Sequence, residues 1–264
     1  MERLKHLQTV ILGIVKDIDE LCQKNGIEYY LLGGSAIGAI RHKGFIPWDD
    51  DLDIIMSADN YERFIDVCRE QLDQEKYYLQ VGLDDWPMYF TKVKLRGTHM
   101  REVEGEAIPE AHNGIYVDIF RLDNAPTNRV AQYVQYFFAK LFLCYQLSER
   151  TYKSANLKKR IMITLSFPLK WRVLRNAVKK YIEHYNSRNC DYWAFFYGRT
   201  NFSTCFVEKK LYGKPLRVNF EDTMLPVPQH YDEYLTQMFG DYMTPPPVEK
   251  RVGLHLIDVD FGKY

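Results

Sequence analysis

The sequence predicts a mixed α/β fold of the α+β class, in which helices flank a central mixed sheet and one helical insertion is added. Three observations indicate this fold. Apolar residues recur at helical spacing over residues 2–24, and strand-like alternation with glycine turns follows over residues 27–120. Helical spacing returns over residues 128–186, with interruptions expected near residues 154–156 and at Pro168. Because no glycine- or serine-rich linker divides these parts, we expect one domain spanning residues 1–264, with residues 127–190 as the helical insertion.

The individual elements follow in order from local signals. An amphipathic helix over residues 2–24 is expected to end near Gly26. A strand over residues 27–33, a glycine turn and a short helix over residues 35–42 come next, and residues 51–56 form another strand. The later elements of the first half are a helix at residues 60–72 and strands at 77–82, 88–95, 98–103 and 114–120, with a loop at 104–113. The C-terminal part is expected to hold strands at residues 204–209, 216–220 and 223–227 and a helix at 230–239.

Charge is unevenly distributed along a chain whose formal net charge is zero. Thirty-five basic residues balance thirty-five acidic ones, so no overall field attracts nucleic acid and we expect no nucleic-acid partner. Residues 148–180 nevertheless carry ten basic side chains and one acid, whereas residues 47–76 carry ten acids and three basic side chains. A basic block of this kind is usually a solvated helix face, and the alternative is contact with a polyanion or an anionic membrane.

Cysteine usage and hydropathy bear on the location of the protein. The five cysteines are odd in number and contain no C-x-x-C pair, which argues against a disulfide framework and a structural zinc site. Acidic residues follow the apolar stretch near the N-terminus, which is therefore predicted to be a helix and not a signal peptide. No uncharged apolar run reaches the roughly 18 residues of a spanning helix. We expect a cytoplasmic protein, with residues 148–180 as the candidate for peripheral contact with the inner face of the membrane.

The stretch with the strongest chemical signal spans residues 31–54. A Gly-Gly-Ser turn between a strand and a helix leaves backbone N–H groups at a helix N-terminus, where they suit a phosphate, although the same glycines also suit an ordinary tight turn. On the following strand Asp51 and Asp53 are two residues apart, so their carboxylates are expected on one face. Such a pair repels unless a divalent cation such as Mg²⁺ lies between the carboxylates, and a plain acidic loop is the alternative.

Further charged side chains occur on neighbouring strands. Asp118 interrupts the apolar strand over residues 114–120, and a buried acid of this kind is costly unless it is paired or bound to a metal. It is the candidate third carboxylate and a candidate base for an acceptor hydroxyl. Lys92 and Lys94 share a strand face and neutralise phosphate charge if they point into the site; exposed strand lysines are the alternative.

Four blocks of the sequence carry a family resemblance. They are GGSAIGAIRHKGFIPWDDDLDI at residues 33–54 and, further along the chain, TKVKLRGT, GIYVDIFRLD and LPVPQHYDEYLTQMFGDYMTPPPVEKR. In this order they resemble the LicD family, the bacterial phosphocholine transferases related to fukutin and fukutin-related protein, within the DNA polymerase β-like nucleotidyltransferase superfamily. The resemblance covers most of the chain outside the helical middle, and it implies a nucleotidyltransferase-like central sheet.

The resemblance also implies roles for individual residues. Gly34 and Ser35 are expected to hold phosphate, and Asp51, Asp53 and Asp118 are expected to be the catalytic carboxylates and to bind the metal. The remaining candidates for substrate binding are Arg41, His42, Asp49, Lys92, Lys94, Arg251 and His255.

The function implied by the resemblance is that of a metal-dependent phosphotransferase. The expected donor is a CDP-alcohol, CDP-choline first among them, and the expected cofactor is Mg²⁺ or Mn²⁺. The expected acceptor is a sugar hydroxyl of a cell-surface glycan, such as lipopolysaccharide or teichoic acid, or of a lipid-linked precursor, with release of CMP. Two positions depart from the family pattern, because Arg121 stands where proline is frequent and Gly-Gly-Ser replaces the Gly-Thr of many phosphocholine transferases. Neither departure removes a catalytic group.

Two other functions share part of this pattern. A DxD-type glycosyltransferase that uses a sugar nucleotide also needs paired aspartates, but a long nucleotide-binding half should precede its motif, and only 50 residues precede Asp51. A non-catalytic relative that binds a glycan or a nucleotide would lack a catalytic acid, and none is missing. The aromatic residues concentrated at 181–198 either cage a quaternary ammonium or bury the insertion against the core, and burial is the more common role.

Overall fold

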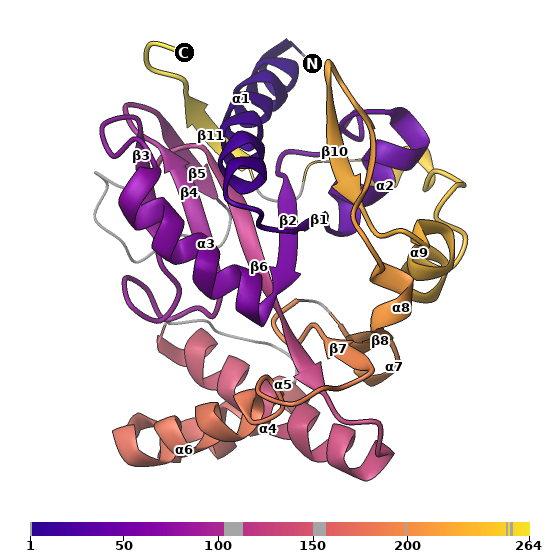
Figure 1. Cartoon of the computed structure of the whole chain (residues 1–264). Coiled ribbons are helices and arrows are strands. Elements are labelled where there is room, and N and C mark those ends of the chain that lie inside the picture. Colours follow the sequence, from indigo (N-terminus) through magenta and orange to yellow (C-terminus); the bar gives the residue numbers. More distant parts are fainter. Residues whose placement is uncertain (1, 103–112, 150–156, 199, 252, 254–255) are drawn as a thin grey trace.

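The computed structural model describes residues 2–102, 113–149, 157–198, 200–251, 253 and 256–264 (Figure 1). In the first half the elements are α1 (Glu2–Lys24), β1 (Tyr30–Leu31), α2 (Gly33–His42), β2 (Asp53–Ser57), α3 (Ala58–Gln71), β3 (Tyr77–Gln80), β4 (Thr91–Leu95), β5 (His99–Glu102) and β6 (Tyr116–Ala125). In the second half they are α4 (Arg129–Glu149), α5 (Leu157–Ser166), η2 (Phe167–Lys170), α6 (Arg172–Glu183), β7 (Tyr192–Ala194), α7 (Phe202–Cys205), β8 (Phe206–Glu208), α8 (Lys209–Tyr212), β9 (Leu216–Phe220), β10 (Thr223–Val227), α9 (Tyr231–Phe239), η3 (Val248–Lys250) and β11 (Leu256–Asp260).

A mixed sheet lies at the centre of the fold. Its strands follow the order β1-β2-β6-β4-β3, and β2 runs parallel to β6 while the other neighbouring pairs on this path are antiparallel. The second half of the long strand β6 continues past this path and pairs with β7, which pairs with β8. The mixed α/β prediction is therefore confirmed, and the neighbouring strands β2 and β6 are the ones that carry Asp53 and Asp118.

Helices α1 and α3 cover one face of this sheet (Figure 1). Buried Ile11, Ile14 and Ile18 recur at helical spacing on α1, so one side of the helix packs into the main core. Helix α3 follows β2 directly and is capped by Ser57, whose hydroxyl accepts a hydrogen bond from the backbone N–H of Asn60 at 3.3 Å. A serine cap of this kind contributes about 1 kcal/mol, which makes the turn from β2 into α3 a sharp and defined one.

The chain between β6 and β7 forms α4, α5, η2 and α6 at the end of the molecule away from both termini (Figure 1). The predicted helical character of residues 128–186 is confirmed, and Pro168 interrupts it as expected, inside the 3-10 turn η2. The interruption expected near residues 154–156 lies outside the described residues. The division of residues 1–264 into a single domain with residues 127–190 as an insertion stays a prediction. Among the described residues, no helix is long and apolar enough to cross a membrane.

A second hydrophobic cluster joins these helices to the strands β7 and β8. It is separate from the main core and includes Phe142, Ile182 and Phe196. Buried Gln135 of α4 donates through Nε2 to the carbonyl oxygens of Asn124 and Ile182, at 3.0 and 2.8 Å, which ties α4 to the end of β6 and to α6. These two hydrogen bonds satisfy the side-chain nitrogen of Gln135 inside the protein, so the join is specific as well as apolar.

Several predicted elements differ from the structure. The first strand is β1, only two residues long, and β2 begins at Asp53 and not at Asp51. The cause at β2 is the bunching of Asp49, Asp50 and Asp51, whose ligand-type atoms lie within 4.8 Å of one another in a bend before the strand. Strand β11, which the sequence did not predict, pairs antiparallel with β5. Most of the loop expected at residues 104–113 lies outside the described residues.

Candidate active site

The glycine turn before α2 brings a helix N-terminus against an aspartate. Gly33 has a φ of 55°, a conformation that glycine adopts without strain, and it starts α2 directly after β1. A Cβ placed on Gly34 would lie 2.7 Å from Oδ2 of Asp49, so any larger residue there would displace this carboxylate. The buried hydroxyl of Ser35 accepts a hydrogen bond from the backbone N–H of Asp53 at 2.9 Å, which couples the start of α2 to the start of β2.

Three charged side chains form a row across the sheet next to this turn. Asp53 of β2 lies directly opposite Asp118 of β6, and Asp118 lies directly opposite Lys92 of β4. Residues in register share a face of the sheet. Nζ of the buried Lys92 is 3.3 Å from Oδ1 of Asp118 and 3.3 Å from the ring centroid of Tyr116. The row therefore pairs one carboxylate with a fixed cation and leaves a second carboxylate beside it.

Asp51, the remaining predicted carboxylate, lies in the bend with Asp49 and Asp50 rather than on β2. Asp51 is therefore not a residue of the strand as predicted, and whether its carboxylate shares a face with that of Asp53 stays a prediction. It still lies close enough to Asp53 for its charge to act there: burial, followed by the charges of Asp51 and Asp118, raises the pKa of Asp53 well above its ordinary value. The structure thus brings Asp51, Asp53 and Asp118 into one acidic region by a different route.

The same crowding acts on Asp49. Burial is the largest cause, and the charges of Asp51 and Asp50 add to it, so that the pKa of Asp49 rises to about 8. A group of carboxylates with mutually raised pKa values is destabilised as long as each is ionised without a nearby cation. Carboxylate oxygens are the ligands preferred by Mg²⁺ and Mn²⁺, and a divalent cation would offset this repulsion. The residues present therefore fit a hard divalent cation.

Two arginines border the acidic region, Arg41 at the end of α2 and Arg251 in the C-terminal tail, and His42 lies beside Arg41. Arg41 donates to the carbonyl oxygen of Tyr242 at 2.5 Å and to Nε2 of His42 at 3.0 Å. Burial and the charge of Arg251 lower the pKa of Arg41, and burial together with Arg41 lowers the pKa of His42. Two neighbouring guanidinium groups favour a ligand with at least two negative charges, and a pyrophosphate has them.

The C-terminal tail reaches the acidic bend. The guanidinium of Arg251 lies 5.3 Å from the ring centroid of Trp48, and its Nε donates to the carbonyl oxygen of Pro246 at 2.8 Å. A Cβ on Gly253 would lie 2.7 Å from Oδ2 of Asp50, so glycine is required for this approach. The tail therefore lies against the acidic bend, and the role of Arg251 in substrate binding stays a prediction. The other tail residue predicted for the site, His255, lies outside the described residues.

Lys94 is buried one strand repeat beyond Lys92, opposite Tyr116 on β6 and Tyr78 on β3. The alternative of exposed strand lysines is thereby excluded for Lys92 and Lys94, which are both buried. Because Lys94 is two residues from Lys92, it lies on the same face of the sheet as the acidic row. Lys94 therefore lies in the core beside the site, and its predicted contact with substrate stays a prediction.

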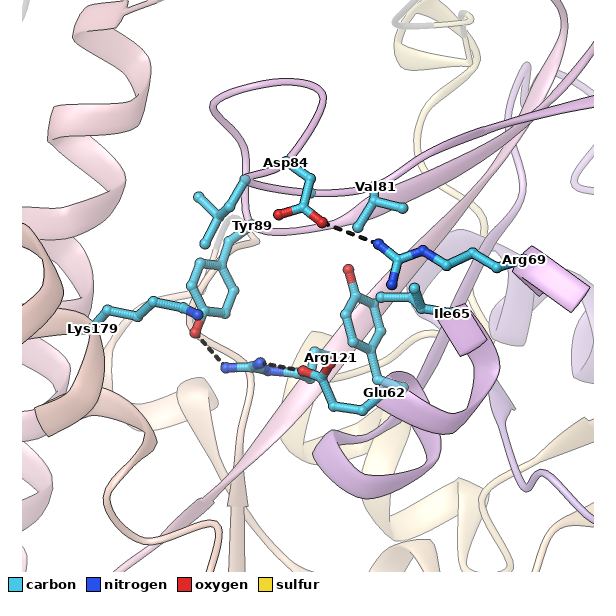
Figure 2. A pocket seen from close by; sticks show the side chains of 11 residues that line it. Glu62, Ile65, Arg69, Val81, Asp84, Tyr89, Arg121 and Lys179 are labelled. Atoms are coloured by element: carbon cyan, nitrogen blue, oxygen red, sulfur yellow. Dashed lines mark hydrogen bonds and ion pairs between the residues drawn. The ribbon is translucent and has the colours of Figure 1, made fainter. Parts of the chain in front are cut away.

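A cavity of about 130 Å³ lies on the other face of the sheet (Figure 2). Its centre is Arg121, which is three residues from Asp118 on β6 and therefore points away from the acidic row. Arg121 pairs with Asp123 and Glu183 at 2.8 Å each and with Glu62 at 3.2 Å. The sequence did not predict this network. It links β6 to α6, so the cavity belongs to the junction between the sheet and the helical segment.

The aromatic residues at 181–198 serve that junction as well. Phe195, Phe196 and Tyr197 are buried, and the Tyr197 ring stacks on Tyr89 with centroids 4.1 Å apart. Burial of the insertion against the core, the more common of the two predicted roles, is what the structure shows for these three rings.

Comparison with known proteins identifies the family. Residues 26–160 match the family described as LicD/FKTN/FKRP, nucleotidyltransferase domain. The chain belongs to the LicD family. Over 263 residues it is 30% identical to the lipopolysaccharide cholinephosphotransferase LicD of Haemophilus influenzae, and the match covers 96% of each chain. Shorter stretches are similar to uncharacterized proteins of Rickettsia prowazekii, at 38% identity over 76 residues (22% of this chain, 29% of the relative), and of Rickettsia typhi, at 53% identity over 47 residues (17% and 15%).

The part of the chain that matches the LicD family contains the glycine turn, the acidic bend and the strands β2, β4 and β6. Arg251 and Gly253 lie outside it, although they complete the site in space. Asp50 and Trp48 are visible within the acidic motif of the sequence. Their contact with the C-terminal tail is not. No local signal marked Gly253, because its contact with Asp50 joins positions 203 residues apart.

Proposed function

We propose that this chain transfers phosphocholine from CDP-choline to a sugar hydroxyl of a cell-surface glycan of the lipopolysaccharide type, and releases CMP. The observation that carries the proposal is the alignment of Asp53, Asp118 and Lys92 across three strands, beside the helix that starts at Gly33. The similarity over the full chain to a lipopolysaccharide cholinephosphotransferase supports the choice of head group and acceptor.

Each group of the site has a place in this reaction. The backbone at Gly34 and the cations Arg41 and Arg251 bind the pyrophosphate of the donor. Asp51, Asp53 and Asp118 would together hold Mg²⁺ or Mn²⁺. When bound, this ion neutralises negative charge on the phosphates. We place the site in a nucleotidyltransferase-like fold on the cytoplasmic side of the membrane, where CDP-activated donors are available.

In the proposed reaction one bond to phosphorus forms and one breaks. The oxygen of the acceptor hydroxyl forms a bond to the β-phosphorus of the donor, and the bond between that phosphorus and the oxygen of CMP breaks. The proton of the hydroxyl passes to the carboxylate of Asp118, which Lys92 holds at 3.3 Å. Positioning and electrostatic stabilisation, rather than a covalent intermediate on the protein, account for the rate in this scheme.

The test measures CMP release with Mg²⁺, a panel of CDP-alcohols and cell-envelope glycans as acceptors. Asp53→Asn should lower the rate at least about a hundredfold, because it removes a carboxylate that would hold the metal against the phosphates. Its thermal midpoint should not fall, since the change also removes repulsion from Asp51 and Asp118. The matched control, Asp222→Asn, alters an exposed aspartate paired with Lys16 and should keep full activity.

Full activity of Asp53→Asn with unchanged metal dependence would overturn this proposal. So would turnover of a UDP-sugar in place of every CDP-alcohol, which is the result a DxD-type glycosyltransferase would give. A protein that binds CDP-choline but releases no CMP with any acceptor would instead be a non-catalytic relative.

A further inference from the structure

Large apolar side chains are exposed on α5, on the 3-10 turn η2 and at the start of α6. Leu157, Ile161 and Leu165 follow one another at four-residue spacing on α5 and are 68%, 51% and 54% exposed, so they form a stripe along that helix. Phe167 and Trp171, at the two ends of the 3-10 turn that follows, are 64% and 71% exposed. Side chains of this size are usually buried or half-buried in a soluble protein.

Further exposed apolar side chains lie at the start of α6, where Val173 is 80% and Leu174 is 40% exposed. The opposite end of α6 is anchored, because Ile182 is fully buried in the second hydrophobic cluster. The apolar surface is thus a feature of the α5–η2–α6 corner, defined here as residues 157–174. Figure 1 shows this corner at the end of the molecule away from both termini.

Cations surround this corner and acids are absent from it. Residues 157–182 contain eight basic side chains and no acidic one. Arg160, Lys170 and Arg172 are exposed among the apolar residues, and Nζ of Lys170 lies 4.8 Å from the ring centroid of Phe167. An exposed apolar surface rimmed by one sign of charge selects a partner that is both apolar and negatively charged.

An anionic bilayer has both properties. Aromatic and aliphatic side chains bind at the boundary between headgroups and acyl chains, and lysine and arginine bind anionic headgroups while their stems lie along the apolar surface. A second copy of this chain fits less well, because a symmetric contact through the corner would bring the same cations face to face.

We propose that the α5–η2–α6 corner is a docking surface for an anionic lipid bilayer, with Phe167 and Trp171 inserted at the interface. The basic block of the sequence supplies the electrostatic half of this contact, and the exposed stripe supplies the apolar half. The proposal does not depend on which group the active site transfers, since the corner is remote from the acidic row and its binding is measured without turnover.

The experiment is vesicle flotation at about 0.1 M NaCl, with phosphatidylcholine vesicles that lack or contain about 30% phosphatidylglycerol. The wild-type protein should float with the anionic vesicles and not with the neutral ones. Phe167→Ser/Trp171→Ser and Lys170→Glu/Arg172→Glu should each weaken binding by about tenfold or more, the first by losing apolar insertion and the second by reversing headgroup attraction.

Matched controls carry the same chemical changes elsewhere. Met224→Ser alters an exposed apolar residue on β10, and Lys5→Glu/Lys263→Glu reverses two exposed charges beside the termini. Both should float like the wild type. Anionic vesicles should also shift the tryptophan fluorescence of the wild type to shorter wavelength, and Trp171→Phe should lose that shift, because Trp171 is the tryptophan of the corner and is 71% exposed.

Circular dichroism and thermal midpoints verify that the variants fold. The proposal is overturned if the wild type stays with the unbound fraction in the presence of anionic vesicles. It is also overturned if Phe167→Ser/Trp171→Ser floats like the wild type. That result would mean that charge alone accounts for membrane binding and that the aromatic side chains do not insert. Concentration-dependent dimerisation that this variant abolishes, without flotation of the wild type, would assign the corner to a second copy of the chain instead.

Discussion

At the scale of single residues, the site depends on very close approaches. Gly34 and Gly253 each leave room for an aspartate carboxylate, at 2.7 Å from the position a Cβ would take. The hydroxyl of Ser35 accepts a hydrogen bond from the backbone N–H of Asp53, so this serine positions the strand that carries a catalytic candidate. A residue predicted to touch substrate thus has a second, structural role that only its partner reveals.

Gly34→Ala tests this close packing. The new methyl group would meet Oδ2 of Asp49 and push the acidic bend away from the helix start, so we expect at least about a tenfold loss of CMP release and about 1–3 kcal/mol lower stability to unfolding. The control is Gly13→Ala in α1, where nothing lies within 4 Å of the added carbon; it should leave activity unchanged and stabilise the helix by about 0.5–1 kcal/mol. Equal effects of the two substitutions would contradict the packing argument.

At the scale of elements, β6 joins two functions on its two faces. Asp118 points into the acidic row, and Arg121 points into the junction with α3 and α6 (Figure 2). Burial by itself would lower the pKa of Arg121, but Asp123 and other neighbouring groups outweigh it and raise that pKa well above its ordinary value. Arg121 stands where the family often has proline. Its buried positive charge is balanced by acidic side chains from three elements.

Arg121→Leu should destabilise the protein strongly. It would leave Asp123 fully buried without its cation, which costs about 3–5 kcal/mol in the free energy of unfolding by chemical denaturation. Arg69→Leu is the control from the rim of the same cavity, where Arg69 and Asp84 are more than half exposed and their pair is worth about 1 kcal/mol or less. A loss below about 1 kcal/mol for Arg121→Leu would show that the network does not hold the junction together.

At the scale of the whole molecule, two hydrophobic cores are held together partly by charge. The main core lies around the sheet, the second lies among α4, α6 and the strands β7 and β8, and Glu183 of α6 pairs with Arg121 of β6 between them. A junction of this kind makes the attachment of the helical segment sensitive to acid.

The sign of this pH dependence follows from Glu183. Burial favours its protonated form, but Arg121 outweighs burial and lowers the pKa of Glu183 below the ordinary value of 4.5. Because its pKa is lower in the folded state, Glu183 contributes its full stability above about pH 5.5 and loses it as the pH falls through 4.5 toward the folded-state value. Asp123 acts in the opposite direction, since burial raises its pKa.

Comparing the wild type with Glu183→Gln separates these contributions. Urea unfolding between about pH 3 and pH 7 should show a stability advantage of the wild type that is constant above about pH 5.5 and shrinks at lower pH. Asp123 is present in both proteins, so its contribution largely cancels. An advantage that stays constant down to about pH 3 would mean that the pair does not stabilise the folded state in the way inferred.

The sequence by itself determined the elements and motifs that depend on near neighbours. Helical spacing located α1 and the helices of residues 128–186, and the segment at 31–54 displayed the glycine turn and the acids of the site within one short stretch. Tertiary structure alone decided the register that sets Asp53 beside Asp118 and Asp118 beside Lys92, and the contact of Gly253 with Asp50. The physical reason is that strand register, tail docking and the exposure of residues 157–174 are set by packing between segments distant in the chain, which no local spacing encodes.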